Sequence, residues 1–195
     1  MALEYAILGF LNYQPLTGYD LKKVFDRSIR HFWHADQSQI YRTLSRLTED
    51  GAVKMEIVEQ TDRPDRKVYS ITPAGRERLL NWLKQPFPDE DSRSKPLVQM
   101  FFSGQISDER ILEKLTEALE GMRRQMAMFD LVPDQVREFT SMAKDDRELF
   151  YWFLTLELGK RSLQTNIDWL ESVVDRIRRQ DYSTEIGFKK EFDSE

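Results

Sequence analysis

A short segment near residue 40 contains side chains of the kinds that bind DNA. If this segment is a helix, Ile40, Leu44 and Leu47 fall on one side of it, where they would face a hydrophobic core. The other side offers hydroxyl, amide and guanidinium groups and no carboxylate, and it consists of Ser38, Gln39, Tyr41, Arg42, Ser45 and Arg46. Such groups donate hydrogen bonds to base edges and to phosphate oxygens. We therefore predict a recognition helix; the alternative is a polar helix face that binds nothing.

Basic side chains also gather at a predicted hairpin turn at residues 61–65. Arg63, Arg66 and Lys67 lie at or beside this turn, where long side chains can reach a DNA backbone or minor groove. Because aspartates lie among them, Arg–Asp pairs on the surface are an equally good interpretation. Lys22, earlier in the chain, could add a phosphate contact that conveys no sequence information.

The elements that position these side chains follow the order helix–helix–helix–strand–turn–strand–helix. Thr17, Asp36 and Thr72 are suitable N-caps, and Pro73 is favoured at the first position of a helix. The predicted helices cover residues 2–12, 17–30, 36–50 and 72–83, and the predicted strands cover residues 53–57 and 67–71. This order is that of a helix-turn-helix with a β-hairpin wing.

The second half of the chain has the periodicity of long helices. Apolar residues are spaced by three and four residues from Leu112 to Phe129, and by seven from Leu149 to Ile177. Two such helices could pair with a second copy across a two-fold axis, or they could pack together within one subunit. We predict dimerisation through Leu112, Leu115, Leu119, Met122, Leu149, Leu156, Leu163, Leu170 and Ile177.

A stretch around residues 85–92 with two prolines and several acidic residues separates the two halves. We expect a winged helix-turn-helix DNA-binding domain at 1–85, a linker at 86–96, a helical dimerisation domain at 97–180 and a polar tail at 181–195. The predicted fold class is mainly α: an α+β winged helix followed by an all-α domain.

The composition excludes several classes of protein. The chain has no cysteine, and no cluster of further ligands accompanies the two histidines, His31 and His34, so we expect no metal and no cofactor. A glycine-rich phosphate loop and a serine nucleophile motif are both missing, which argues against an enzyme. The apolar runs are too short to span a membrane, and we expect a soluble cytoplasmic protein.

The charge balance differs between the two halves. The whole chain of 195 residues has a net charge of −5, whereas residues 1–85 contain 13 basic and 11 acidic side chains. The mildly basic first half agrees with a nucleic-acid partner. The acidic average supports an alternative, a winged-helix module that binds another protein and not DNA.

Four motifs of the first half stand in a fixed order: Tyr5-Ala6-Ile7-Leu8-Gly9, Leu16-Thr17-Gly18-Tyr19-Asp20-Leu21, Ser38-Gln39-Ile40-Tyr41 with Leu44 and Leu47, and Arg66-Lys67-Val68-Tyr69-Ser70-Ile71-Thr72-Pro73-Ala74-Gly75. Together with 97–102 and 168–172 in the second half, they closely resemble the PadR family of bacterial transcriptional regulators. The resemblance implies a homodimeric repressor that binds an operator with dyad symmetry and is often released by a small molecule.

Aromatic residues could form the site for that molecule. Phe32 and Trp33 precede the predicted recognition helix, and Tyr151, Trp152 and Phe153 belong to the last long helix. If the fold brings them together, they would line an apolar pocket for a phenolic acid or another hydrophobic compound. The alternative is that these side chains belong to the core.

Overall fold

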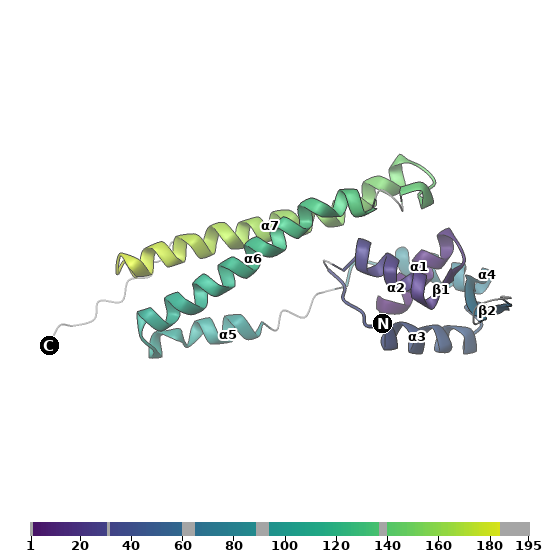
Figure 1. The fold of residues 1–195 in the computed structure, drawn as a ribbon, viewed down its shortest axis with the longest axis horizontal. Helices are drawn as coiled ribbons and strands as arrows, with labels where there is room; N and C mark the ends of the chain where they lie inside the picture. Colours follow the sequence, from purple (N-terminus) through teal and green to yellow (C-terminus); the bar gives the residue numbers. More distant parts are fainter. Residues whose placement is uncertain (1, 31, 60–64, 89–93, 137–139, 184–195) are drawn as a thin grey trace. The chain divides into compact units, whose positions relative to one another are not determined.

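The computed structural model describes residues 2–30, 32–59, 65–88, 94–136 and 140–183 (Figure 1). The chain forms two compact units, Met1–Glu90 with Leu131–Gly159, and Asp91–Asp130 with Lys160–Glu195. This grouping joins the middle of the second half to the N-terminal unit, where we expected one continuous C-terminal domain. Within the first unit, the rings of Tyr13 and Trp152 lie edge to face at 5.3 Å, and the Gln14 side-chain amide approaches the Met142 sulfur at 3.6 Å.

The N-terminal unit has the predicted order of elements with one extra strand. The elements are α1 (Ala2–Tyr13), β1 (Leu16–Thr17), α2 (Gly18–Ser28), α3 (Gln37–Glu49), β2 (Val53–Val58), β3 (Arg66–Ile71) and α4 (Pro73–Leu83). The strands form an antiparallel sheet in the order β1-β3-β2. Strand β1 was not predicted because two residues are too few to show an alternating pattern.

The predicted N-caps begin three of these helices. The Thr17 hydroxyl accepts a hydrogen bond from the Asp20 backbone N–H (3.1 Å), and Thr72 does the same for Gly75 (3.1 Å). Asp36 and Gln39 form a complete capping box at the start of α3. Helix α3 ends before Gly51, whose φ of +72° is a backbone conformation that glycine adopts without strain.

The core of this unit lies where α1, α2 and α3 meet the sheet. The predicted inner face of α3 is buried, since Ile40, Leu44 and Leu47 are fully inaccessible to solvent. They pack with the apolar faces of the other elements, which contribute Ile7, Leu8, Leu11, Leu21, Val24, Phe25, Val53, Tyr69 and Leu79. The predicted fold class, a winged helix followed by helices, is confirmed.

The second half is helical, as predicted. It consists of α5 (Lys95–Phe101), a short 3₁₀ turn η1 (Ser103–Gln105), α6 (Asp108–Val136), a second turn η2 (Thr140–Met142) and α7 (Asp146–Arg178). In the C-terminal unit, α6 and α7 run side by side (Figure 1), and Arg123 of α6 pairs with Glu171 of α7 at 2.6 Å. Of the described helices, none has the length and apolar character needed to cross a membrane.

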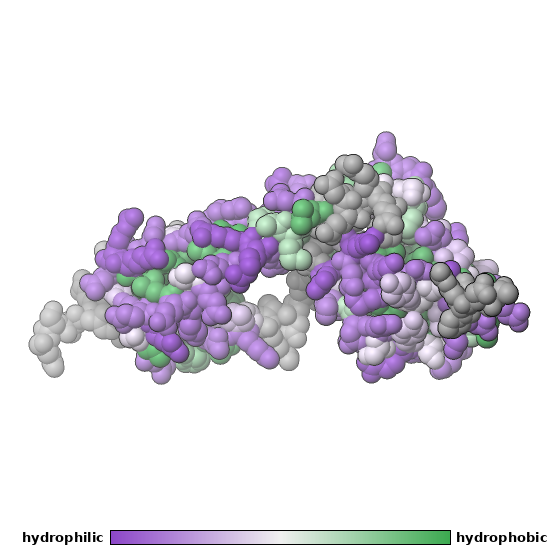
Figure 2. Space-filling model, viewed as in Figure 1, coloured by the Kyte–Doolittle hydropathy of each residue, from purple (hydrophilic) through white to green (hydrophobic). Residues whose placement is uncertain are grey.

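The helical seam predicted for dimerisation is partly used within one chain. Leu115, Leu119, Leu163 and Leu170 are all buried in the C-terminal unit. The intramolecular alternative therefore applies to these four residues, because α6 and α7 of the same subunit cover each other's apolar stripes. Hydrophobic surface remains among the hydrophilic side chains of this unit (Figure 2), including most of the Phe101 side chain, which is 82% exposed on α5.

Candidate nucleic-acid interface

Helix α3 presents the predicted polar face to solvent. Its buried stripe fixes the rotation of the helix about its own axis, so the opposite side must point outward. The side chains exposed on that side are Ser38, Gln39, Tyr41, Arg42 and Ser45. They lie close together on one helix, and they are the hydrogen-bonding groups that could meet a base edge.

Several of these groups already make hydrogen bonds inside the helix. The Ser38 hydroxyl donates to the Asp36 carboxylate (2.7 Å), and the Gln39 side-chain oxygen accepts from the Asp36 backbone N–H (3.0 Å). The hydrogen bond from Ser38, followed by that from the Gln39 N–H, lowers the pKa of Asp36 below its ordinary value. A carboxylate thus marks the beginning of α3, and the exposed cation Arg42 follows six residues later.

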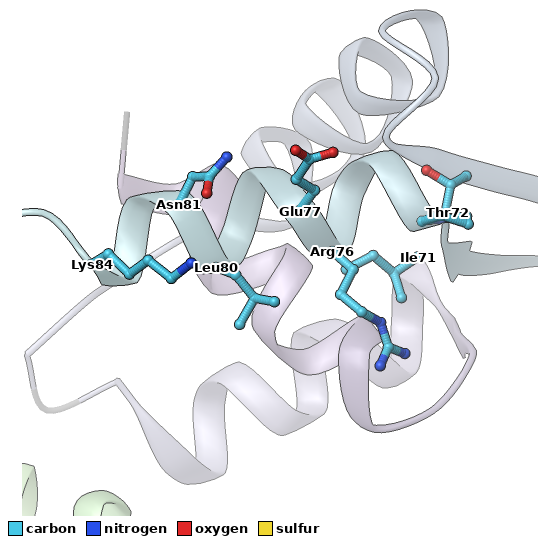
Figure 3. Close-up of a pocket in the computed structure, with 8 residues that line it drawn as sticks. Ile71, Thr72, Arg76, Glu77, Leu80, Asn81 and Lys84 are labelled. Atoms are coloured by element: carbon cyan, nitrogen blue, oxygen red, sulfur yellow. The ribbon is translucent and has the colours of Figure 1, made fainter.

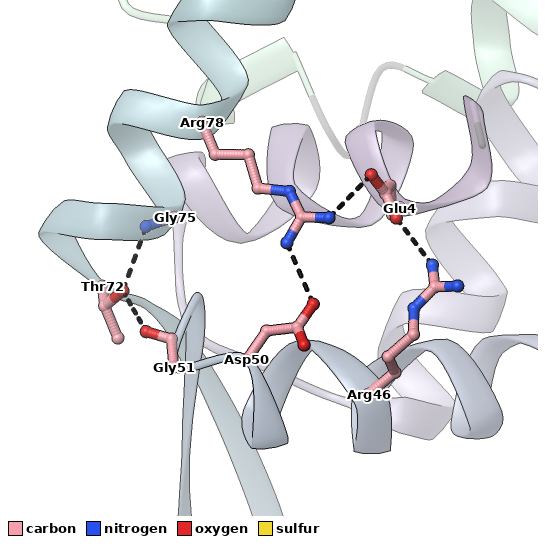
Figure 4. A network of polar contacts seen from close by, with 7 residues as sticks. All are labelled: Glu4, Arg46, Asp50, Gly51, Thr72, Gly75 and Arg78. Carbon is pink, nitrogen blue, oxygen red and sulfur yellow. Dashed lines mark hydrogen bonds and ion pairs between the residues drawn. The ribbon is translucent and has the colours of Figure 1, made fainter.

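Arg46, which we predicted to contact DNA, is part of a charged network that joins three helices (Figure 4). Its guanidinium group lies 2.6 Å from one carboxylate oxygen of Glu4 in α1. The other oxygen of Glu4 lies 3.0 Å from Arg78 of α4, and Arg78 also pairs with Asp50 at 3.0 Å. Glu4 itself is only 5% exposed. The network thus ties α3 to α1 and α4, and Arg46 helps to hold these helices together in this structure.

Sequence reasoning did not identify Glu4, although a signal existed. Glu4 is the only charged residue in the apolar segment 2–13. A carboxylate in such a segment is expected either to face solvent or to be paired, because burying an unpaired charge is costly. Its partners, however, are 42 and 74 positions away along the chain, and only folding brings them together.

Tyr41 is held against the beginning of α2 by a close contact with Gly18. A methyl group at Gly18 would lie 2.5 Å from the Tyr41 ring, closer than any real contact, so glycine leaves the space that the ring occupies. The two residues line a depression of about 520 Å³ between α2, α3 and the wing, together with Thr17, Tyr19, Asp20, Asp65, Arg66 and Lys67. This depression lies on the same side of the unit as the exposed face of α3.

The wing contributes one paired and one exposed cation to this depression. The Arg66 guanidinium lies 3.2 Å from the Asp20 carboxylate, so the Arg–Asp interpretation holds for Arg66, with a partner on α2. Lys67 is exposed, and Arg63 lies outside the described residues. Lys22 forms an ion pair with Asp26 one turn away on α2.

A second depression lies on α4, away from α3. Its volume is about 580 Å³, and Arg76, Glu77, Leu80 and Lys84 are among the residues that line it (Figure 3). None of the residues that line it belongs to α3, so it is separate from the depression beside Tyr41. Among the residues that the structure describes, which do not include His31, no group of acidic or histidine side chains is arranged to hold a metal ion.

The aromatic residues are arranged differently from the simple cluster that we considered. Trp152 donates a hydrogen bond from its indole N–H to the Tyr13 hydroxyl (3.3 Å), and burial raises the pKa of Tyr13. Phe32 is 54% exposed and Trp33 is 37% exposed, and Tyr151 packs against Phe150. Trp152 therefore pairs with α1, a partner that the sequence did not reveal, and the effector pocket stays a prediction.

Two family models cover most of the chain. Residues 7–81 match the transcriptional regulator PadR-like family, and residues 92–178 match the family described as virulence activator alpha C-term. The protein named "Probable transcriptional regulator Rv1176c" of Mycobacterium tuberculosis is 31% identical over 189 residues, which are 92% of this chain and 100% of that protein.

A second relative links the chain to solved structures. The negative transcriptional regulator PadR of Bacillus subtilis is 29% identical over 90% of this chain and 97% of its own length. Its structure in complex with operator DNA matches with a TM-score of 0.78 at 26% identity, over 91% of this chain and 99% of that one. Its complex with p-coumaric acid matches with a TM-score of 0.71 at 25% identity, over 90% and 95%.

These relatives are regulators of transcription and not enzymes. Their similarity extends over both units, and it includes the winged helix that presents the exposed polar face of α3. The chain belongs to the PadR-like family of transcriptional regulators.

Proposed function

We propose that this regulator is a ligand-responsive repressor that binds a dyad-symmetric operator as a homodimer in the cytoplasm. The observation that carries the proposal is the solvent-facing set of hydrogen-bonding side chains on α3, opposite a stripe that is completely buried. The operator complex of Bacillus subtilis PadR, a negative regulator of the same family, supports it.

In this proposal α3 enters the major groove of the operator. Arg42 donates two hydrogen bonds to a guanine edge, the commonest specific contact between an arginine and DNA. Tyr41, Ser38 and Ser45 contact neighbouring bases or phosphates, and Lys67 on the wing contacts the backbone. Arg46 has an indirect role in this proposal, because its ion pair with Glu4 fixes how α3 is oriented on the domain.

Dimerisation places two such helices at half-sites about one DNA turn apart. Exposed apolar side chains on the helical half of the chain support a second copy as the partner, and they include Leu97, Val98 and Phe101 on α5 and Phe150, Leu154 and Leu158 on α7. Two members of the predicted seam, Leu112 and Leu156, are also partly exposed. Sedimentation of the full chain should give the mass of a dimer.

The effector in this proposal is a phenolic acid or another hydrophobic compound. It binds beside the aromatic residues Phe32, Trp33, Tyr151, Trp152 and Phe153, and the p-coumaric acid complex of Bacillus subtilis PadR supports this class of ligand. A ligand that weakens DNA binding must itself bind less tightly to the DNA complex. Intrinsic tryptophan fluorescence measures binding of the ligand to the free protein and to the DNA complex, and operator affinity measured in parallel shows whether the ligand weakens DNA binding.

Capture of genomic DNA fragments by the purified protein tests the central proposal. Sequencing of the captured fragments should return a small set of sites that share an inverted repeat. Binding to those sites should weaken with salt by a log–log slope of about −0.9 for each phosphate that is neutralised. A protein-binding module would enrich no sequence and would show no such slope, and that result would refute DNA recognition.

A further inference from the structure

Asp20 is placed beside a cation of the wing. It lies in the first turn of α2, and its carboxylate accepts a hydrogen bond from the Thr17 hydroxyl (2.7 Å). The same oxygen accepts a second hydrogen bond from the Arg66 guanidinium at 3.2 Å. A residue needed only to cap the helix would not require the second contact, which ties the end of the wing nearest its turn to α2.

The charges around Asp20 oppose one another. Two carboxylates, Asp20 and Asp65, and two cations, Arg66 and Lys67, line the depression beside Tyr41. A phosphate that entered this depression would meet Lys67 but also the charge of Asp20, and Arg66 would be engaged. The depression therefore has the donors of a phosphate site without the net positive charge that such a site needs.

We propose that Asp20 restrains sequence-independent DNA binding by keeping Arg66 from the phosphate backbone. The inference rests on the proposed function and adds a residue that tunes it. Phosphate contacts raise the affinity for every sequence equally, whereas base contacts distinguish one sequence from another. A regulator with fewer free cations at its DNA-facing surface is held less tightly by the rest of the genome, where non-specific sites are in great excess.

The size of the effect follows from counterion release. Loss of the Asp20 charge frees Arg66 to neutralise one more phosphate in each subunit that contacts DNA. Each further phosphate steepens the log–log dependence on salt by about 0.9, which amounts to roughly eight-fold tighter binding at about 0.1 M salt. A dimer that contacts the DNA with both subunits therefore gains about 1.8 in slope and roughly 60-fold in affinity. The gain is the same for operator and random DNA.

The test compares Asp20→Asn with Glu77→Gln in the full chain. The asparagine oxygen can still accept the Thr17 hydrogen bond, so the helix cap is kept. Glu77 makes a matched control because it lies on α4, in a depression that shares no residue with the one beside Tyr41, and its replacement removes the same charge from the same domain. The probe is a labelled random-sequence duplex of about 30 base pairs, long enough for both half-sites. Affinity is measured at several salt concentrations between about 50 and 300 mM.

We expect a steeper slope for Asp20→Asn and the wild-type slope for Glu77→Gln. Adding Arg66→Ala to Asp20→Asn should restore the wild-type slope, because the freed cation is then missing. Equal slopes for Asp20→Asn and Glu77→Gln, or a gain that survives Arg66→Ala, would overturn the proposal. If Asp20→Asn does not fold, Asp20→Ser removes the charge and keeps a hydroxyl beside Thr17.

Failure of this inference is distinguishable from failure of the proposed function. If the wild type binds captured operator fragments and Asp20→Asn leaves both affinities and slopes unchanged, only the role of Asp20 is refuted. If the wild type itself shows no salt-dependent binding to any duplex, DNA recognition is refuted and the role of Asp20 with it.

Discussion

The contact between Gly18 and Tyr41 predicts an energetic coupling between α2 and the recognition helix. Gly18 is the first residue of α2, and a methyl group there would lie 2.5 Å and 2.7 Å from two carbons of the Tyr41 ring and 2.9 Å from its hydroxyl oxygen. Without that obstacle, Gly18→Ala would stabilise the fold by about 0.4–1 kcal/mol, because alanine restricts the unfolded chain. Because the Tyr41 side chain occupies that space, the substitution must either displace the ring or shift α2.

The ring is the part that should move, since Tyr41 is 40% exposed and can rotate toward solvent. Overpacking that forces a side chain out of place costs about 1–3 kcal/mol. We therefore expect Gly18→Ala to destabilise the domain by about 1–2 kcal/mol, the difference between these two effects. We also expect weaker DNA binding, because Tyr41 leaves its position at the depression.

Urea unfolding of four variants measures this coupling directly. Gly9→Ala is the matched control, because a methyl group at Gly9, in α1, meets nothing within 4 Å. In a Tyr41→Ala background, Gly18→Ala should become neutral or stabilising, so the double-mutant cycle should give a coupling of about 1–3 kcal/mol. If the two glycine substitutions have equal effects in both backgrounds, Tyr41 does not pack on Gly18 and the described position of its ring is wrong.

Three further predictions concern the same domain. Arg42→Ala should weaken operator binding by about 1–3 kcal/mol and leave the unfolding free energy unchanged; equal losses for operator and random DNA would contradict a base contact. Glu4→Gln should lower the unfolding free energy by about 1–3 kcal/mol. This is less than the usual cost of breaking a buried ion pair, because the side chains of Arg46 and Arg78 are each about a third exposed. An unchanged urea midpoint would refute the network. The pKa of Asp36 lies below its ordinary value of 3.8, so its cap should stabilise α3 above that pH and lose this effect as the pH falls through the lower, folded-state pKa. Asp36→Asn should remove that part of the acid dependence, as thermal unfolding between about pH 2 and pH 6 would reveal.

Local sequence determined the elements of the winged helix and the outward face of α3. Caps such as Asp36 with Gln39, and the buried stripe of Ile40, Leu44 and Leu47, depend on residues only three or four positions apart. Signals of that range can be read without knowing the fold. They sufficed to place the side chains of the candidate interface on one surface, although their contacts with DNA remain a prediction.

Periodicity in the second half identified apolar stripes but not what covers them. The spacing of Leu115, Leu119, Leu163 and Leu170 is equally suited to a partner subunit and to a neighbouring helix of the same chain. Packing of α6 along α7 decided in favour of the same chain for these four. An apolar pattern reports that a face must be buried, whereas the surface that buries it is a property of the folded molecule.

Tertiary structure also decided which cations lie beside a carboxylate. Arg46 and Arg66 read as DNA contacts in the sequence, but folding places them beside Glu4 and Asp20, 42 and 46 residues away along the chain. An ion pair depends on a separation of a few ångströms, to which sequence distance gives no guide when the partners belong to different elements. The residue types near α3 were thus determined locally, and the charge that they present to DNA was determined by the fold.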